Sequence, residues 1–204
     1  MARDTGPRLK KMRALGLNLP GLSRKSMKHR EFPPGEQGHA RRRKPSDYGL
    51  QLKEKQKLRF NYGLGERQFR RLVSEARRGR KAAGDQLLEF LERRLDNVVF
   101  RTGYAPTIPA ARQLVNHGHF TVNSRRVDVS SFRVKEGDVI KPRERSLKLD
   151  VIATSLLEIS LIRPDWLNFD DKTLTATVAA LPSPDSVPFP VDVSSVIEYY
   201  AKRL

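Results

Sequence analysis

Positive charge is concentrated in the first part of this chain and limits where a hydrophobic core can form. The 204 residues carry a formal net charge of +17. Residues 1–90 hold 24 Lys and Arg against 9 Asp and Glu, whereas residues 151–204 hold 4 against 7. A chain with this surplus repels itself and attracts a polyanion. The charge therefore indicates nucleic acid as the partner, with an anionic membrane surface as the alternative.

The composition and motifs exclude or disfavour several other classes of function. The absence of cysteine excludes disulfides, thiolate metal sites and cysteine nucleophiles. No N-terminal run resembles a signal peptide, and no stretch is apolar enough to span a bilayer. Phosphate-binding glycine loops, serine-hydrolase elbows and dinucleotide fingerprints do not occur. We therefore expect a cytoplasmic protein that is not an enzyme, with no catalytic residues, cofactor, metal, membrane contact or small-molecule substrate.

Residues 1–46 are predicted to form an extended basic arm. Ten Gly and Pro residues interrupt this segment, so no helical or strand periodicity persists. Such an arm buries too little apolar surface to offset its conformational entropy in water. It can become ordered on a phosphate backbone, where it releases counterions. In the densest basic run, 41–44, we favour phosphate contact over a merely solvated or nuclear-localisation-like run.

Residues 47–90 are predicted to form a helical domain. One helix is expected from Asp47 to about Asn61. A second helix, 66–78, has an apolar stripe on one face and arginines on the other. A third is expected to begin near Asp85 and to continue without a break to Arg101.

A mixed α/β domain is predicted for residues 91–191, and a final helix at 192–203 is expected to pack back on the helical domain. The first part of the mixed domain, 91–143, is too small to contain a catalytic pocket of its own. Its expected elements after the long helix are a helix at 110–117 and strands at 120–123, 127–129 and 139–141. The expected elements beyond it are a helix at 150–160, strands at 166–169 and 173–180, and a proline-rich connector.

Several motifs resemble one known family. The central motifs RLDNVVFRTG at 94–103 and ARQLVNHGH at 111–119 resemble the RNA-binding module named after small-subunit ribosomal protein S-four. The segments GPRLK, LPGL, PPGEQG and EKQKLRFNYGL, which begin at residues 6, 19, 33 and 54, resemble the N-terminal half of that protein. The segment IEYY at 197–200 resembles its C-terminal helix. The chain is thus similar to the bacterial or plastid S-four family over most of 1–143 and its last dozen residues.

The resemblance implies an α+β fold: a helical N-terminal domain with a basic arm, and a module of two helices and a short antiparallel sheet. It implies a structural constituent of the small ribosomal subunit that binds the five-prime domain of the rRNA and nucleates assembly. It also implies a place near the mRNA entry channel, beside the fifth small-subunit protein, and a role in the accuracy of translation. The expected partners are small-subunit rRNA, neighbouring ribosomal proteins and, in a second role, mRNA. The expected location is the small subunit in the cytoplasm or the plastid stroma.

The predicted RNA-binding residues combine the family motif with the basic clusters. Those carried over from the module are Arg94, Arg101, Arg112, Gln113, His117, His119, Asn123 and the turn residue Arg125. Those from the basic clusters are Arg3, Arg8, Lys10, Arg41, Arg42, Arg43, Lys44, Lys55, Arg59, Arg67, Arg70, Arg71 and Arg126. Two departures from the family motif matter. Ser124 stands where the turn usually has glycine, which predicts a strained turn or another turn type, and Ile108 removes a basic contact.

Two short motifs allow a catalytic or a metal-binding interpretation as well as a structural one. Arg94-Leu95-Asp96 resembles a catalytic motif of some pseudouridine synthases, but gripping an extruded base requires a large pocket. We therefore favour an aspartate that pairs with a neighbouring arginine. For His117 and His119, RNA contact or a surface role is favoured over a metal site, because no clustered carboxylates accompany them. Two alternatives remain open: a translational repressor that binds its own mRNA, and an RNA-modifying enzyme that docks through the module.

Overall fold

The structure is a computed structural model that describes residues 6–27, 32–39, 44–159 and 161–201. The chain divides into two compact units. The first unit comprises Met1–Leu87 and Phe189–Leu204, and the second comprises Leu88–Pro188. We describe each unit by itself.

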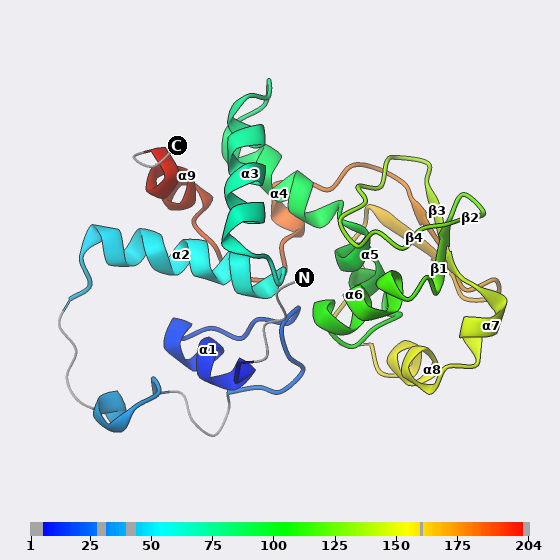
Figure 1. Ribbon diagram of the computed structural model, residues 1–204, viewed down its shortest axis with the longest axis horizontal. Coiled ribbons are helices and arrows are strands. Elements are labelled where there is room, and N and C mark those ends of the chain that lie inside the picture. The colour runs from blue at the N-terminus through cyan, green and yellow to red at the C-terminus, as the bar shows by residue number, and fades with distance from the viewer. Residues whose placement is uncertain (1–5, 28–31, 40–43, 160, 202–204) are drawn as a thin grey trace. The chain divides into compact units, whose positions relative to one another are not determined.

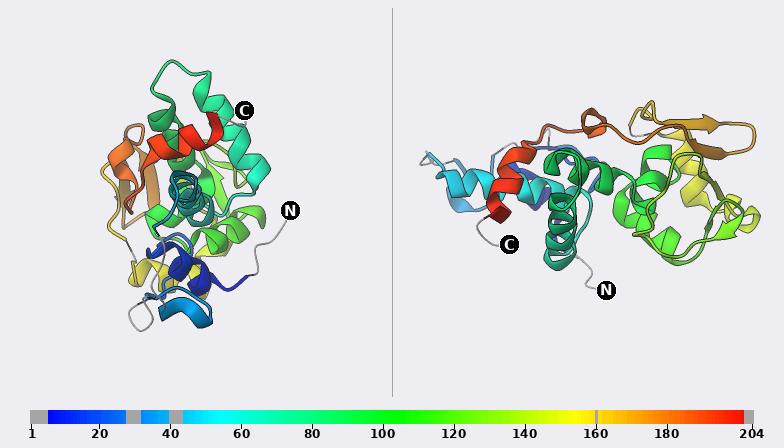
Figure 2. Two further views of the ribbon diagram at one scale, coloured as in Figure 1. Left: turned by 90° about the vertical axis from the view of Figure 1, so that its left-hand side faces the viewer. Right: turned by 90° about the horizontal axis from the view of Figure 1, so that it is seen from above.

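The first unit is helical. Its described elements are α1 (Arg8–Leu15), the 3-10 turn η1 (Glu36–His39), α2 (Asp47–Asn61), α3 (Glu66–Arg77), the start of α4 (Ala83–Glu92) and α9 (Val193–Ala201). α9 packs against α2 and also contacts α3 (Figures 1 and 2). Tyr199 stacks on Tyr48 at 5.8 Å between ring centroids, and Tyr200 lies 5.9 Å from Phe69. Residues from the two ends of the chain therefore share one core, and aromatic side chains supply much of its buried area.

The expectation that residues 1–46 contain no helix is wrong. α1 forms between Pro7, its N-cap, and Gly16, which ends it in the left-handed conformation at φ 68°. These two residues bound the helix rather than interrupt it, since proline suits a helix start and glycine the position after its end. Met12 and Leu19 of this segment are fully buried. The segment is therefore part of the core of the first unit.

The second unit combines helices with one antiparallel sheet. Its described elements after α4 are α5 (Leu95–Thr102), α6 (Ile108–Asn116), β1 (Phe120–Val122), β2 (Arg125–Arg126), β3 (Val139–Pro142), α7 (Glu144–Leu147), α8 (Asp150–Leu157), β4 (Leu167–Asp170), β5 (Thr175–Val178) and the 3-10 turn η2 (Pro184–Ser186). The strand order is β2-β1-β3-β5-β4, and all paired neighbours are antiparallel. The pair β4–β5 is clear in the right panel of Figure 2. The α+β class and the module of two helices and a short antiparallel sheet are confirmed.

The single helix expected over 85–101 is two helices. The chain breaks at Arg94, which is extended (φ −67°, ψ 137°) and caps α5. At the break, Leu95 N donates to Phe132 O at 2.8 Å, and Val134 N donates to Arg93 O at 2.9 Å. These bonds to a distant segment take the place of helical bonds that are lost at the break. The apolar periodicity continues on both sides, which is why the sequence pattern did not show the break.

The first hairpin has a two-residue turn with both residues in the left-handed region, which is the strained one of the two alternatives that the sequence left open. Val122 pairs with Arg125, so Asn123 and Ser124 form the loop. Their φ angles are 49° and 65°, which is the pattern of a type I′ turn. The second strand accordingly lies at Arg125–Arg126 and not at 127–129, because the two-residue loop brings residue 125 into pairing. The short helix α7 was not predicted.

Ser124→Gly should stabilise the second unit by about 1 kcal/mol, because glycine adopts a positive φ without the steric cost that serine has there. Urea denaturation monitored by circular dichroism measures this change. Asn123→Gly is the matched control at the other turn position. Its amide donates to Asp138 Oδ1 at 2.8 Å and accepts from Val139 N at 2.9 Å, so its loss should destabilise. Equal effects of the two substitutions would contradict this account of the turn.

Candidate RNA-binding surface

The predicted RNA-binding residues fall into three groups by exposure. The exposed ones are Arg8, Lys10, Lys44, Arg67, Arg70, Arg71, Gln113, His117, Asn123, Arg125 and Arg126. The half-buried ones are Arg59, Arg112 and His119, and the buried ones are Lys55, Arg94 and Arg101. Arg3, Arg41, Arg42 and Arg43 lie outside the described residues. Since a phosphate contact requires an accessible cation, only the first two groups are suited to form a binding surface as they stand.

In the second unit, the end of α6 and the β1–β2 hairpin bring four basic side chains together around Gly118. A Cβ at Gly118 (φ 74°) would lie 2.3 Å from Arg126 Nε, so only glycine allows that guanidinium to approach so closely. Arg143 Nη1 donates to Gly118 O at 3.4 Å. The rings of His117 and His119 lie 6.0 Å apart. We call His117, His119, Arg126 and Arg143 the Gly118 cluster.

His119 is held in a defined orientation within this cluster. Its Nδ1 lies 3.0 Å from Oγ of Ser146, a buried residue of α7. Burial, followed by the positive charges of His117 and Arg143, lowers the pKa of His119 below its ordinary value. His119 is therefore favoured as a neutral hydrogen-bonding group near pH 7 rather than as a cation.

The sequence reasoning missed Arg143 as a candidate. Its backbone N donates to His119 O at 2.9 Å, which ties the end of β3 to the Gly118 cluster. The available signal was the basic run 141–148, which holds four Lys and Arg directly after the third strand. That run does not belong to the family motifs, and only the sheet pairing of β1 with β3 brings it beside α6.

Arg94 and Arg112 meet at a buried carboxylate. Asp96 is fully buried and accepts two bonds from Arg94, at 3.0 and 2.8 Å. It also accepts two bonds from Arg112, at 3.0 and 2.7 Å. The predicted pairing of Asp96 with a neighbouring arginine is confirmed. Arg94 is thus a buried structural ion, whereas the side chain of Arg112 is 21% exposed.

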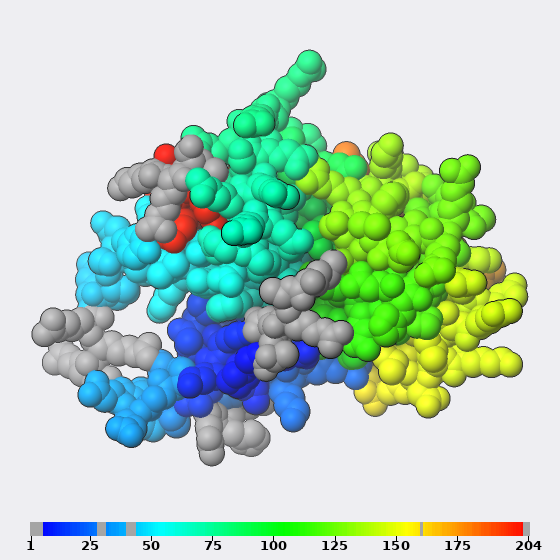
Figure 3. Space-filling view, in the orientation of Figure 1, coloured from blue at the N-terminus to red at the C-terminus, as the bar shows by residue number. Residues whose placement is uncertain are grey.

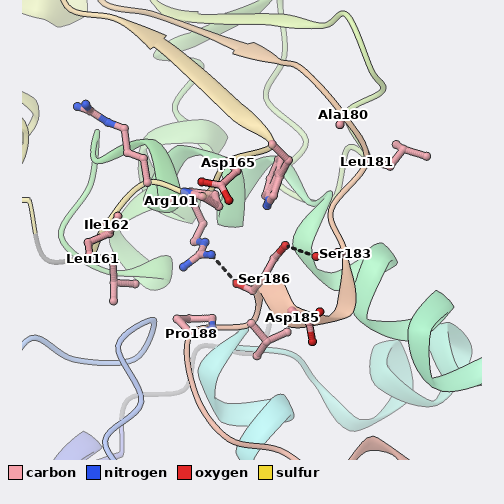
Figure 4. Close-up of a pocket in the computed structure, with 14 residues that line it drawn as sticks. Arg101, Leu161, Ile162, Asp165, Ala180, Leu181, Ser183, Asp185, Ser186 and Pro188 are labelled. Atoms are coloured by element: carbon pink, nitrogen blue, oxygen red, sulfur yellow. Dashed lines mark hydrogen bonds between the residues drawn. The ribbon is translucent and has the colours of Figure 1, made fainter.

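Arg101 is buried at a second carboxylate. Its Nε lies 3.5 Å from Oε2 of Glu92, which is fully buried, and its Nη2 donates to Ser186 O at 2.5 Å. Figure 4 shows this bond in a pocket of about 710 Å³ that the second unit forms. The pocket is also lined by Asp165 and Asp185, and no histidine lines it. Because Arg101 is buried and pairs with Glu92 and with Ser186 O, it contributes to folding rather than to this surface.

In the first unit, the outward face of α3 carries exposed arginines. Arg67, Arg70 and Arg71 lie on this face, while Phe69 and Val73 face the core. Figure 3 shows part of this surface in teal. The helical period of 3.6 residues separates the two sets, as the sequence predicted.

Lys55 is buried in a network that joins α2, α3 and α9. It donates to Glu66 at 3.1 Å, and its Nζ lies 4.8 Å from the centre of the Tyr199 ring. Tyr200 donates its hydroxyl to Glu66 at 2.6 Å. Burial raises the pKa of Glu66, but the bonds from Tyr200 and Lys55 and the charges of Lys55 and Arg59 outweigh it, so the pKa lies below its ordinary value.

Glu66→Gln should lower the free energy of unfolding at neutral pH, because it leaves Lys55 buried with less compensation. The difference from the wild type should vanish in acid. A carboxylate with a lowered pKa in the folded state stabilises above its ordinary pKa, and this contribution is lost as the pH falls through the folded-state value. Urea midpoints of both proteins between neutral pH and about pH 3 measure the difference. A constant difference over this range would contradict the ionic role of Glu66.

The described residues were not found to form a metal cluster or a membrane-spanning helix. Within residues 6–27, 32–39, 44–159 and 161–201, no group of three or more His, Asp or Glu could hold a metal ion. None of the helices in these ranges has the length and apolar character needed to cross a membrane.

Comparison with known proteins identifies the family. Residues 3–92 match the family model described as the ribosomal protein S4/S9 N-terminal domain, and residues 93–140 match the S4 domain. These matches define the class: a ribosomal protein that carries an S4 domain. Relatives named small ribosomal subunit protein uS4 or uS4B occur in Methylobacillus flagellatus, Nitrosomonas europaea and Acaryochloris marina, at 55%, 53% and 48% identity. Each comparison covers 100% of this chain and of the relative. The chain belongs to the uS4 family of the small ribosomal subunit.

Membership confirms the resemblance drawn from the sequence motifs. The protein is a structural constituent of the small ribosomal subunit and acts in translation. Proteins of this family are structural and not enzymatic, so the RNA-modifying enzyme is not retained as an alternative. Membership also implies rRNA and other ribosomal proteins as the partners.

Proposed function

We propose that this protein binds the five-prime domain of small-subunit rRNA through exposed basic side chains on both of its units. The observation that carries the proposal is the Gly118 cluster. Two histidines and two arginines from α6, the β1–β2 hairpin and the end of β3 meet at one glycine whose missing side chain makes room for a guanidinium. The two guanidinium groups would bind a phosphate backbone through charge-assisted hydrogen bonds, and the neutral His119 beside them adds a further hydrogen-bonding group.

The binding proposed here recognises shape and phosphate rather than base sequence. Side chains cannot read the deep, narrow major groove of A-form RNA, so phosphates and 2′-hydroxyls are the accessible groups. Arginine forms two parallel bonds to a phosphate, which suits Arg126 and Arg143. The neutral His119 suits a hydroxyl or phosphate oxygen as a hydrogen-bond donor. The exposed face of α3 and the basic residues of the first unit would contact further RNA helices.

The role of the protein in subunit assembly and its position in the subunit are also proposals. We infer that the protein binds rRNA early, nucleates assembly, and lies near the mRNA entry channel in contact with the fifth small-subunit protein, where it supports the accuracy of translation. The support is the full-length similarity to uS4 proteins together with exposed basic surfaces on both units, which would allow one protein to join several RNA helices. Footprinting of the rRNA at successive stages of in vitro assembly tests the order. Protection that appears only in late particles would contradict early binding.

Affinity for in vitro transcribed five-prime-domain rRNA should fall steeply with salt, by on the order of 10³-fold between about 50 and 200 mM. In the double variant Arg126→Ala/Arg143→Ala, the slope of log affinity against log salt should become shallower by about 1.4–1.8, since each lost phosphate contact removes about 0.7–0.9. Filter binding over a salt series measures both slopes. Lys172→Ala is the control, because Lys172 is an exposed cation of the same unit outside the Gly118 cluster. A flat wild-type salt response, or equal effects of the two variants, would rule out this mechanism.

A further inference from the structure

We infer that Asp96, a buried carboxylate, positions the guanidinium of Arg112 for contact with RNA phosphate. This inference rests on the proposed function, because it concerns how one half-buried cation of that surface is held. Asp96 itself is fully buried and does not touch the ligand. It is therefore a positioning residue that acts through Arg112.

The geometry around Asp96 leaves its carboxylate little freedom. Oδ2 accepts from Arg112 Nε at 3.0 Å and from Arg112 Nη2 at 2.7 Å. Arg94 Nε donates to Oδ1 at 3.0 Å, and Arg94 Nη2 donates to Oδ2 at 2.8 Å. The backbone N of Asn97 also donates to Oδ1 at 3.0 Å. Five bonds thus converge on two oxygens, so neither the carboxylate nor the guanidinium planes that it contacts can rotate without loss of several bonds.

Arg94 connects this carboxylate to the backbone framework. It caps α5 and forms an isolated β-bridge with Arg133, and its side chain is only 6% exposed. Arg94 and Asp96 are therefore rigid parts of the scaffold. Arg112, on α6, is the member of the trio with appreciable exposure, at 21% of its side chain. The buried pair forms a fixed base against which one edge of the Arg112 guanidinium is held.

This arrangement lowers the entropic cost of binding. A solvated arginine loses rotamer freedom when a ligand immobilises it. The bonds to Asp96 impose that loss during folding, before any RNA is present. A guanidinium whose plane is already set therefore binds phosphate with a smaller entropy loss, which is the effect of preorganisation.

The positioning role of Asp96 and its negative charge predict opposite changes in rRNA affinity when Asp96 is neutralised. Asp96 offsets one of the two arginine charges, so counting charge alone predicts stronger rRNA binding when Asp96 is neutralised. Positioning predicts weaker binding, because the Arg112 guanidinium loses its fixed plane. The sign of the change in affinity therefore distinguishes the two explanations.

Arg112→Lys tests the inference with little risk to folding. Lysine keeps the positive charge but lacks the planar fork that spans Nε and Nη2. We expect affinity for five-prime-domain rRNA at moderate salt to fall about tenfold, nearly as far as in Arg112→Ala, with both variants shown by circular dichroism to be folded at the assay temperature. Wild-type affinity in Arg112→Lys would overturn the inference, because a point charge would then be sufficient.

Asp96→Asn supplies the second test, with Glu136→Gln as the charge-matched control. Glu136 is an exposed carboxylate of the same unit. The control should bind rRNA at least as tightly as the wild type, whereas Asp96→Asn should bind about tenfold more weakly and have no further effect in the Arg112→Ala background. Tighter binding by Asp96→Asn would overturn the inference. If Asp96→Asn does not fold, the rRNA affinity of Arg112→Lys alone tests the inference. If the wild type binds rRNA in a salt-sensitive way and the Arg112 variants bind with the same affinity, this inference alone is wrong. If the wild type does not bind rRNA, the proposed function is wrong.

Discussion

Arg101→Ala should lower the free energy of unfolding of the second unit by about 3–5 kcal/mol and leave the salt slope of rRNA binding unchanged. The family motif places Arg101 among the RNA-binding residues, but the folded chain buries it beside Glu92. Removing the arginine takes away the cation beside the buried Glu92 carboxylate, which the Asn97 amide, donating to it at 3.0 Å, does not replace. It also removes the bond to Ser186 O. Urea denaturation gives the stability, and filter binding over a salt series gives the slope.

A compensating variant separates charge burial from general disruption. In the double variant Glu92→Gln/Arg101→Met no unpaired charge stays buried, so much of the lost stability should return, since apolar replacements of buried ion pairs are often nearly neutral. Arg94 offers a parallel case, because it is also buried beside a buried carboxylate. If Arg101→Ala kept wild-type stability and bound rRNA with a shallower salt slope, the assignment of Arg101 to the scaffold would be wrong.

Deleting residues 1–27 should destabilise the first unit by more than about 5 kcal/mol. The deletion removes the side chains of Met12, Leu19 and Leu22, which are at most 4% exposed. Loss of one such buried side chain costs about 2–5 kcal/mol, and a whole domain has about 5–15 kcal/mol of stability. The bond from Gly21 N to Asn61 Oδ1, 2.9 Å long and buried, is lost as well. Hydrogen exchange of α2 amides should show the loss of protection directly.

The matched control keeps the fold of this segment and changes only its charge. Lys10 and Lys25 are exposed, so replacing both with glutamine should leave the urea midpoint nearly unchanged and weaken rRNA binding. The sequence alone predicted that residues 1–46 form an extended arm that buries too little apolar surface to be ordered in water. A truncated protein with the wild-type midpoint would support that expectation over the packed segment.

The sequence predicted a structural feature correctly where the residues that determine it lie within a few positions of one another. The helix at Asp47–Asn61 was predicted with both of its ends, and in the structure Ser46 caps its first turn, where its Oγ accepts from Gly49 N at 3.3 Å. The apolar stripe of 66–78 was predicted because a 3.6-residue period is visible in the chain itself. Serine in place of glycine at 124 predicted a strained turn or another turn type, and the structure has the strained form, with Ser124 at φ 65°.

Long-range pairing determined what those patterns could not. The break at Arg94 depends on hydrogen bonds to residues 132–134, and the burial of Arg101 depends on Glu92 and on Ser186, 85 residues away. Whether a basic side chain faces solvent or pairs inside the fold depends on such partners, and an arginine looks the same in the sequence in either case.

Composition, charge gradient and motifs by themselves determined the family, the α+β class and the affinity for a polyanion. These properties follow from residue types and short spacings, which every conformation of the chain shares. The tertiary structure alone decided which cations are accessible, that Arg143 joins the Gly118 cluster, and that residues 6–27 belong to a core. The physical reason is that burial and ion pairing depend on segments far apart in the sequence, and folding is what brings those segments together.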